Sequence, residues 1–257
     1  MSPRSQNDGA ATGDPVEPAR NIDNPAAMVL ASFSAAAGTD GSTTQRAYLA
    51  LRRLIVVGEI EPGEKLKIDG LRKRLGMGAS PIREALSLLT SDNLVERIDQ
   101  RGFRAAPVSQ KNFEEILRLR CTLEDMALRQ SIGRMTEDHE EELVLVHHRM
   151  LRRAGGDPEA FEEAHKDFHM ALLTSCDAPI LLKLCSQLYD LNIRYRYLAG
   201  RSLNYRTRNV ADEHRDILQA TIARDPDLAS ARLLAHYRQT GAFLADLFGE
   251  SRLAVPD

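Results

Sequence analysis

Residues 71–97 read LRKRLGMGASPIREALSLLTSDNLVER, and this stretch decides the fold of the N-terminal half. Leu71 and the leucine four residues later share one face and predict a short helix that ends at Gly76, a residue suited to the left-handed conformation of a helix C-terminus. A second helix is predicted to start with Ser80 as N-cap and Pro81 in its first position. Two short helices joined by a tight, glycine-containing turn indicate a helix-turn-helix, which places its second helix in the DNA major groove.

The flanking segments complete a winged helix. STTQRAYLALRRLIVVGEI, which begins at Ser42, has one apolar face and predicts a helix capped by that serine or by Thr43. LVERIDQRGFRAAPV, over residues 94–108, predicts two short strands around a Gln100–Gly102 turn. We therefore expect a winged helix-turn-helix DNA-binding domain over residues 43–108.

The charge distribution agrees with a polyanion-binding module in this part of the chain. The 257 residues carry a formal net charge of −3. Residues 44–108, however, hold twelve Lys or Arg against eight Asp or Glu, whereas residues 109–257 hold twenty against twenty-four. A basic block beside a mildly acidic one predicts a polyanion-binding module joined to a second module of another kind.

Composition predicts a globular protein of the cytoplasm with no membrane span. No run approaches the roughly 18–20 apolar residues that a span needs, and the first residues lack the apolar core of a secretory signal. Cys121, Cys176 and Cys185 form no C-x-x-C pair and fit a reducing compartment. Residues 1–42 are rich in Ala, Gly, Ser, Asp and Pro without sustained periodicity, and they predict a disordered tail.

From residue 112 onward the pattern is helical and predicts an all-α bundle over residues 111–250. Six helices are expected, over residues 111–132, 136–153, 157–175, 178–199, 207–224 and 226–248. Asp-Pro or Ala-Pro pairs mark the starts of the third, fourth and sixth. Six helices can enclose a cavity. The expected fold class is therefore mainly α: an N-terminal winged helix-turn-helix followed by an all-α helical bundle.

The order and spacing of LRRLIVVGEIEPGEKL, of the stretch quoted above and of QRGFRAAPV resemble the GntR family of bacterial transcription regulators. The resemblance implies DNA contact by Ser80 and Arg83 in the second helix, and by Arg101 and Gly102 in the wing. The chemistry agrees, since an arginine near the helix start can fork onto a guanine edge or a phosphate, and a serine hydroxyl can donate to a phosphate at the positive end of a helix. Many members have an arginine where this chain has Ala79, so one base contact of the family is absent.

LRLRCTLEDMAL, HKDFHMALLTSC and EHRDILQATIARDPDLASARLLAH resemble the FCD type of effector domain found in the FadR branch of that family. Many such domains hold a metal ion with an Asp, a His four residues later and two further His on the last helices. In this chain that layout implies His169, His214 and His236, with His165 standing where Asp is usual. Imidazole nitrogens suit zinc or nickel, so the resemblance implies one such divalent ion on four histidines, or on three of them with an indifferent fourth.

Other interpretations of the histidines stay open. They could form a hydrogen-bonded polar core without metal, since a spacing of four also suits two partly buried helix residues. Alternatively, the cavity could bind an organic anion directly on imidazoles and arginines. His147 and His148 are adjacent and are expected at the surface. The H-x-x-x-H pattern lacks the general-base glutamate of zinc proteases, since Lys166 stands there, and we expect no enzyme.

The resemblance also implies a small carboxylic acid as effector. Arg120 matches an arginine position that often binds the acid in the family, and a plain ion pair with Glu124 is the alternative. Arg196 falls near one helix face with Tyr189 and Asn192 and is a second candidate. Members with similar segments control the catabolism of short dicarboxylates, glutarate among them.

The expected function is a ligand-responsive transcription regulator, most simply a repressor. A homodimer would bind a palindromic operator in double-stranded DNA through two winged helices. The acid would change operator affinity through a coupling free energy of roughly 1–3 kcal/mol. The alternatives are a metal-binding helical protein with a protein-interaction winged helix and, more remotely, a metal-dependent enzyme. The affinity of a DNA-binding winged helix for nucleic acid should fall steeply as the salt concentration rises, whereas a protein-interaction winged helix should show little such dependence.

Overall fold

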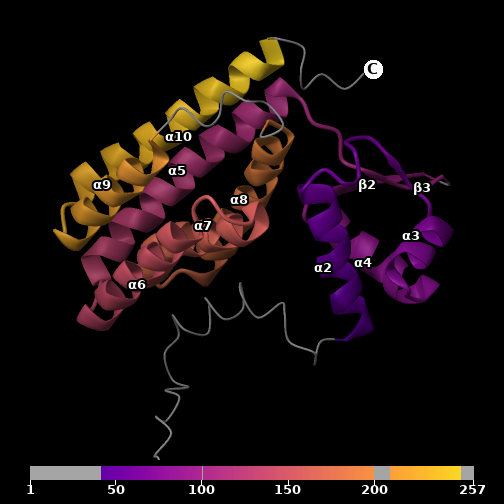
Figure 1. Cartoon of the computed structure of the whole chain (residues 1–257), viewed down its shortest axis with the longest axis horizontal. Coiled ribbons are helices and arrows are strands. Elements are labelled where there is room, and N and C mark those ends of the chain that lie inside the picture. Colours follow the sequence, from indigo (N-terminus) through magenta and orange to yellow (C-terminus); the bar gives the residue numbers. More distant parts are fainter. Residues whose placement is uncertain (1–41, 100, 200–208, 250–257) are drawn as a thin grey trace, which may run out of the picture.

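Two groups of elements follow each other along the chain in the computed structural model, which describes residues 42–99, 101–199 and 209–249 (Figure 1). The first group comprises α2 (Thr43–Val56), β1 (Lys65–Leu66), α3 (Ile68–Leu75), α4 (Ala79–Ser91), β2 (Val95–Ile98) and β3 (Gly102–Ala105). The second comprises α5 (Gln110–Arg134), α6 (Glu137–Arg153), α7 (Pro158–Leu173), the 3-10 turn η2 (Thr174–Cys176), α8 (Pro179–Ala199), α9 (Val210–Ile222) and α10 (Pro226–Gly249).

This arrangement confirms the mainly α class, with a winged helix-turn-helix before a helical bundle. Within the described residues, no helix is long and apolar enough to cross a membrane. The tail expected over residues 1–42 lies outside the described residues apart from Ser42, and so does Gln100 of the wing turn.

In the winged helix, α2, α3 and α4 pack around an apolar core that includes the fully buried Leu51, Ile82 and Leu86. β3 lies between β1 and β2 in an antiparallel sheet. The side chain of Ser42 accepts a backbone hydrogen bond at the start of α2, as the sequence predicted. Gly76 ends α3 in the left-handed conformation, with φ at 64°, which confirms the turn predicted there.

The start of α4 corrects the sequence prediction. The helix begins at Ala79 and its N-cap is Gly78, whose backbone is extended, so Ser80 and Pro81 lie inside the first turn. The Ser80 hydroxyl donates to Glu84 Oε1 at 3.1 Å instead of accepting from the backbone of the helix. Proline is tolerated there because the first N–H groups of a helix have no intrahelical partner.

Each of the six helices expected in the second half is present in the part of the chain that the structure describes. The third is shorter than expected, because α7 ends at Leu173 and the chain continues as η2. α5 packs against α8 and α10, and α6 packs against α7. The core includes Leu128, Leu143, Phe168, Ile217 and Leu233, one from each of α5, α6, α7, α9 and α10.

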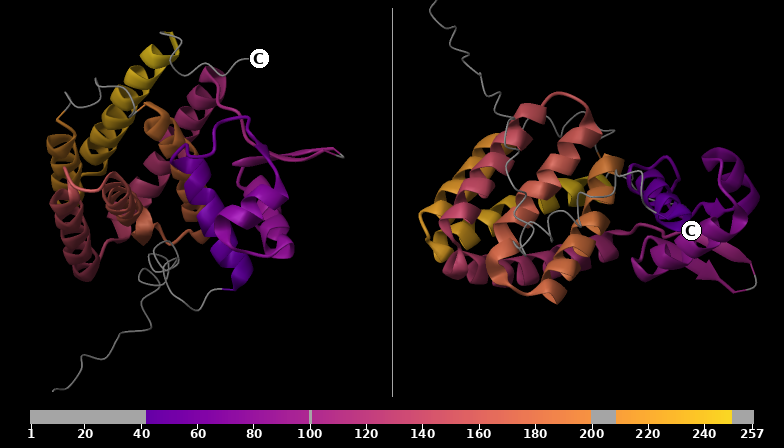
Figure 2. Two further views of the ribbon diagram at one scale, coloured as in Figure 1. Left: turned by 45° about the vertical axis from the view of Figure 1, so that its right-hand side comes forward. Right: turned by 90° about the horizontal axis from the view of Figure 1, so that it is seen from below.

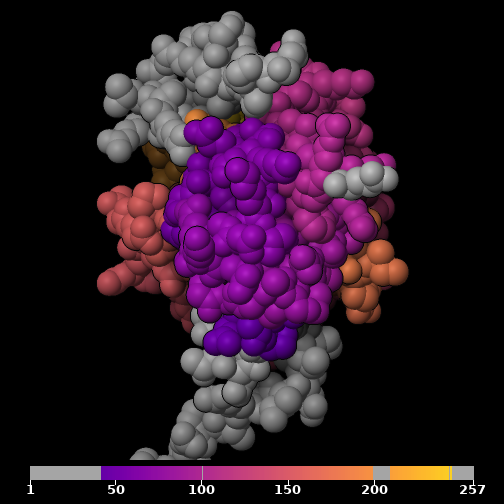
Figure 3. All heavy atoms as spheres, turned by 90° about the vertical axis from the view of Figure 1, so that its right-hand side faces the viewer, coloured from indigo at the N-terminus to yellow at the C-terminus, as the bar shows by residue number. Residues whose placement is uncertain are grey.

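The winged helix packs against α8 of the bundle (Figure 2), and it lies in front of the bundle in the view of Figure 3. Tyr189 and Ile193 of α8 belong to the same buried cluster as the core of α2. Asp190 Oδ1 of α8 lies 2.5 Å from Arg52 Nη2 of α2 and 2.7 Å from Lys166 Nζ of α7. The two parts of the chain therefore share one carboxylate, which ties the position of α2 to those of α7 and α8.

Candidate functional site

Four histidines from three helices meet inside the bundle. His165 and His169 stand one turn apart on α7, while His214 comes from α9 and His236 from α10. None exposes more than 6% of its surface, and one ring nitrogen of each lies within 4.8 Å of the others. The structure thus brings together the four residues that the sequence singled out.

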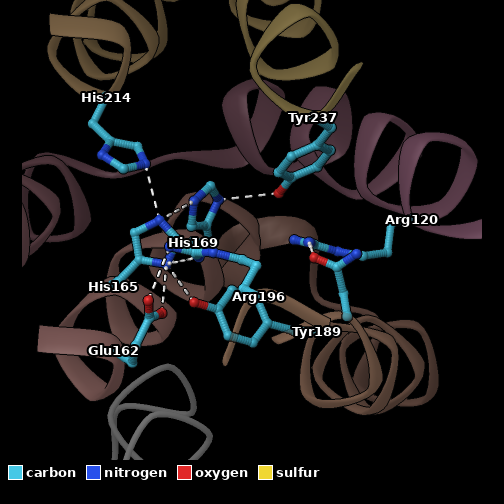
Figure 4. A network of polar contacts seen from close by, with 9 residues as sticks. Arg120, Glu162, His165, His169, Tyr189, Arg196, His214 and Tyr237 are labelled. Carbon is cyan, nitrogen blue, oxygen red and sulfur yellow. Dashed lines mark hydrogen bonds and ion pairs between the residues drawn. The ribbon is translucent and has the colours of Figure 1, made fainter. Parts of the chain in front are cut away.

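The Nε2 atoms of three rings face one another (Figure 4). His165 Nε2 is 3.1 Å from His214 Nε2 and 3.2 Å from His169 Nε2. Zinc–nitrogen bonds of about 2.0–2.1 Å in a tetrahedral site place ligand nitrogens roughly 3.3–3.4 Å apart. The observed spacing is close to that value, and it also suits N–H···N hydrogen bonds between neutral rings.

Two of the imidazoles are held from behind by carboxylate and phenol groups. His236 Nδ1 bonds Glu213 Oε2 at 2.7 Å, and His169 Nδ1 lies 3.0 Å from Tyr237 Oη. The Tyr237 hydroxyl itself donates to Glu124, so its oxygen accepts from His169. Both histidines then carry their proton on Nδ1 and present the Nε2 lone pair to the centre, which is how metal-ligating histidines are normally held. The donor set therefore fits a metal ion.

Burial keeps His165 and His169 neutral. The pKa of His165 lies well below its ordinary value, first because of burial and then because Arg196 and the other rings are close. The pKa of His169 is lowered in the same way, by burial and then by His214 and His236. Neutral imidazole is the form that binds a metal ion, and these rings are in that form at neutral pH.

The two arginines expected to bind an acid are held by protein carboxylates. Arg120 is buried, pairs with Glu124 at 2.7 Å and donates to Asn192 at 3.0 Å. Arg196 pairs with Glu162 at 2.9 Å. The ion pair that the sequence offered as the alternative role of Arg120 is therefore present, in a buried setting.

The cavity beside these arginines is narrow. It is lined by Arg120, His165, His169, Asn192, Arg196, His236, Tyr237 and Thr240. Its volume is about 10 Å³, which is roughly the space of one water molecule. A metal ion fits between the nitrogens, but an organic acid requires side chains to move apart.

Histidines outside the cluster differ from the sequence prediction in one case. His147 is buried, with its ring 5.2 Å from that of Phe168, whereas His148 is exposed. The expectation of two surface residues was wrong for His147, because adjacent residues lie about 100° apart on a helix and only one of them faces α7. Its four-residue spacing from the buried Leu143 was the signal that could have placed it. His139 is also buried and bonds a backbone carbonyl of α7 at 2.8 Å.

The residues expected to touch DNA lie on the winged helix, with Ser80 and Arg83 in the first turns of α4, and Arg101 and Gly102 at the wing. Arg83 is exposed. The Ser80 hydroxyl already donates to Glu84, so it can donate to a phosphate only by releasing that bond. Gly102 has φ at 95° and a Cβ there would meet no atom within 4 Å, so its backbone conformation, and not crowding, requires glycine.

Strand pairing adds basic residues that were not identified from the sequence. Lys65 of β1 lies opposite Arg104 of β3, which in turn lies opposite Glu96 of β2 and pairs with it at 2.6 Å. These three side chains, with Arg97 and Arg101, border a hollow of about 530 Å³ beside the wing. β1 has only two residues, too few to show the alternation by which a strand is predicted.

Two family models match the chain. The model described as bacterial regulatory proteins, gntR family, matches residues 43–104, and the FCD domain model matches residues 115–239. The second match includes all four clustered histidines.

Relatives of the chain are transcription regulators. It is 34% identical over 202 residues to an uncharacterized HTH-type transcriptional regulator, BphR, of Paraburkholderia xenovorans, which covers 76% of this chain and 82% of BphR. It is 29% identical over 202 residues to the HTH-type transcriptional repressor GlaR of Escherichia coli, which covers 76% of this chain and 92% of GlaR. The solved structure of E. coli McbR/YncC is similar with a TM-score of 0.72 at 25% identity, over 81% of this chain and 99% of that one.

Proposed function

Because the chain belongs to the GntR family of bacterial regulatory proteins and carries an FCD domain, it is a DNA-binding transcription regulator, and we propose that it is a repressor whose operator affinity responds to a metal ion and a small carboxylic acid in the helical domain. The observation that carries this proposal is the buried group of four histidines whose ring nitrogens lie within 4.8 Å of one another, two of them with a pKa well below its ordinary value. Similarity to GlaR, a transcriptional repressor, supports repression over activation.

For the metal we propose zinc or nickel, held by His165, His169, His214 and His236. Imidazole suits both ions, and four nitrogens complete the tetrahedral site that zinc favours. When bound, the ion supplies positive charge beside the cavity that would hold the acid. A metal-free, hydrogen-bonded cluster would have similar distances between nitrogens, so metal content separates the two.

For the effector we propose a short carboxylic acid, such as a dicarboxylate of the size of glutarate. Arg120 and Arg196 border the cavity beside the histidines and carry forked donors that match a carboxylate. The acid must compete with Glu124 and Glu162 for them or use their remaining donors. Because the cavity has room for roughly one water, we expect binding to move α8 relative to α7.

The proposed route from the cavity to the winged helix runs through adjacent residues of α7 and α8. His165 Nδ1 contacts the Tyr189 hydroxyl inside the bundle. The next residue on each helix, Lys166 and Asp190, forms the ion pair that also holds Arg52 of α2. A shift of the first pair therefore moves the second, which gives a ligand a physical connection to the DNA-binding domain.

We propose that two copies bind one palindromic operator. α5 and α8 pack against each other and expose apolar side chains at Leu119, Met126, Ile180 and Leu184, each 43–79% exposed. Such groups on neighbouring helices are typical of a subunit interface, and a second copy on them would give the two-fold symmetry that a palindrome requires. Sedimentation should show a dimer for the wild type and a monomer for Ile180→Lys, Leu184→Lys; a dimer in both would exclude this surface.

The test of the proposed function uses the full chain and an operator selected from random double-stranded DNA. Fluorescence anisotropy measures operator affinity for metal-free protein, with Zn²⁺, and with Zn²⁺ plus glutarate, over a range of salt. We expect a steep loss of affinity with salt, from counterion release, and a change of roughly 5–150-fold on adding the ligands. An operator affinity that neither the metal nor any short carboxylic acid changes would contradict the proposal.

A further inference from the structure

The hydrogen bonds around His165 differ from those around His169 and His236. Its Nδ1 atom contacts the Tyr189 hydroxyl and is 3.1 Å from Arg196 Nη1, and Glu162 Oε2 lies 3.6 Å away (Figure 4). The Tyr189 hydroxyl can donate or accept, but an arginine has donors and no acceptor, so Nδ1 accepts while Arg196 stays in this position. The proton of the neutral His165 ring is then on Nε2, the atom that faces the other rings.

A protonated Nε2 cannot bind a metal ion. It instead donates to the lone pair of a neighbouring ring, at 3.1 Å for His214 or 3.2 Å for His169. His169 and His236 are in the opposite state, since their Nδ1 atoms donate outward and leave Nε2 unprotonated. These two rings are therefore already prepared as metal ligands, and His165 is not.

We propose that Arg196 is a positioning residue that decides whether His165 binds the metal ion, an inference that rests on the metal centre proposed above. For His165 to become a ligand, Arg196 must leave Nδ1 and the ring proton must move from Nε2 to Nδ1, so the ring stays neutral throughout. An acceptor for the relocated proton is present, because Glu162 Oε2 is buried and has no hydrogen-bond partner. The result is a carboxylate behind the ligating imidazole, as in other metal sites.

Release of Arg196 also links the metal to an anion. The guanidinium keeps Glu162 Oε1 as a partner of Nη2 at 2.9 Å, and its Nη1 group becomes available to the cavity that Arg196 borders. A carboxylate that binds Nη1 holds Arg196 away from His165 and favours coordination by four histidines. Metal and carboxylate therefore increase each other's affinity by the same factor.

Cobalt(II) is a suitable probe, because its visible absorption is strong in a four-coordinate site and weak in a six-coordinate one. Arg196→Met removes the donor to His165, and Arg196→Lys retains one. Arg194→Met is the matched control, at a buried arginine on the same helix and outside the histidine cluster. We expect Arg196→Met to bind Co²⁺ about tenfold more tightly than wild type, the scale of one hydrogen bond to a charged group, with stronger absorption. The other two variants should resemble the wild type.

His165→Gln distinguishes the possible failures. It should remove the gain in the Arg196→Met background, so its cost in cobalt affinity should be about tenfold larger there than in the wild type. Equal affinity and equal spectra in wild type and Arg196→Met would overturn the role of Arg196 and leave the metal centre intact. No cobalt bound by any natively folded variant would overturn both. If Arg196→Met does not fold, Arg196→Met combined with Glu162→Gln gives the same test, because it leaves no unpaired carboxylate and keeps an accepting oxygen.

Discussion

Replacing Asp190 with asparagine tests the joint between the winged helix and the bundle. Its carboxylate is 2.5 Å from Arg52 and 2.7 Å from Lys166, and the three side chains are only 16–25% exposed. Burial alone would raise the pKa of Asp190, but Lys166 and Arg52 together hold it below its ordinary value. The group is therefore charged at neutral pH, and Asp190→Asn leaves two cations facing each other.

The size of the effect follows from burial. Removing one partner of a buried ion pair costs about 3–5 kcal/mol. Here each cation keeps some contact with solvent, so we expect the free energy of unfolding to fall by about 3 kcal/mol, the lower end of that range. Asp227→Asn is the matched control, because Asp227 pairs with Arg129 at 2.6 Å with 88% of its side chain exposed. Such a surface pair contributes about 0–1 kcal/mol.

Urea unfolding followed by circular dichroism measures both variants against the wild type. Because the pKa of Asp190 is depressed in the folded protein, its contribution is present above the unfolded value of about 3.9. It is lost as pH falls through the folded value, so the gap between wild type and Asp190→Asn should narrow in acid. The variant should also weaken the effect of Zn²⁺ on operator affinity. If Asp190→Asn lowered the free energy of unfolding no more than Asp227→Asn does, the stabilising role of the Asp190 contacts with Arg52 and Lys166 would be refuted.

Arg83→Ala should weaken operator binding by about 1–3 kcal/mol and relax the base preference at one position of the operator. Arg101→Ala should instead weaken binding to all DNA sequences alike. Fluorescence anisotropy on operator and on random DNA distinguishes the two effects, and the reversed pattern would contradict the assignment. Stability should fall by up to about 1.4 kcal/mol per pH unit for each of His165 and His169 below about pH 6.5, because the unfolded chain takes up protons that the folded protein, with its lowered histidine pKa values, does not. Equal urea midpoints at pH 7.5 and 5.5 would argue against this. Gly102→Ala should lower the free energy of unfolding by about 1 kcal/mol, because a φ of 95° strains a residue that has a side chain. Thermal unfolding measures this change, and an unchanged midpoint temperature would speak against strain at this position.

Local signals in the sequence predicted the winged helix well because they act within a few residues. Gly76 ends a helix through its own backbone, and Ser42 caps one through its own side chain. The start of α4 was misplaced because Gly78 and Ser80 both suit a cap, and the sequence does not say which of them has the extended backbone.

The histidine cluster could be predicted from the sequence only in part. Spacing placed two histidines on one helix face, whereas the approach of His214 and His236 came from the family resemblance. Their supporting groups were missed, since Glu213 precedes His214 in the chain but bonds His236. The packing of α9 against α10 determines that Glu213 bonds His236, and helix packing likewise determines the narrow cavity. Neither feature leaves a periodic pattern in the sequence.

Metal content tests the four-histidine centre most directly. Mass spectrometry would be run on protein purified without a histidine tag, beside the double variant His169→Ala, His214→Ala. We predict near-stoichiometric zinc or nickel in the wild type and its loss in the variant. No metal in either protein, even after metal is added and the sample desalted, would contradict the centre and leave the histidines as a hydrogen-bonded core or as direct contacts for an organic anion.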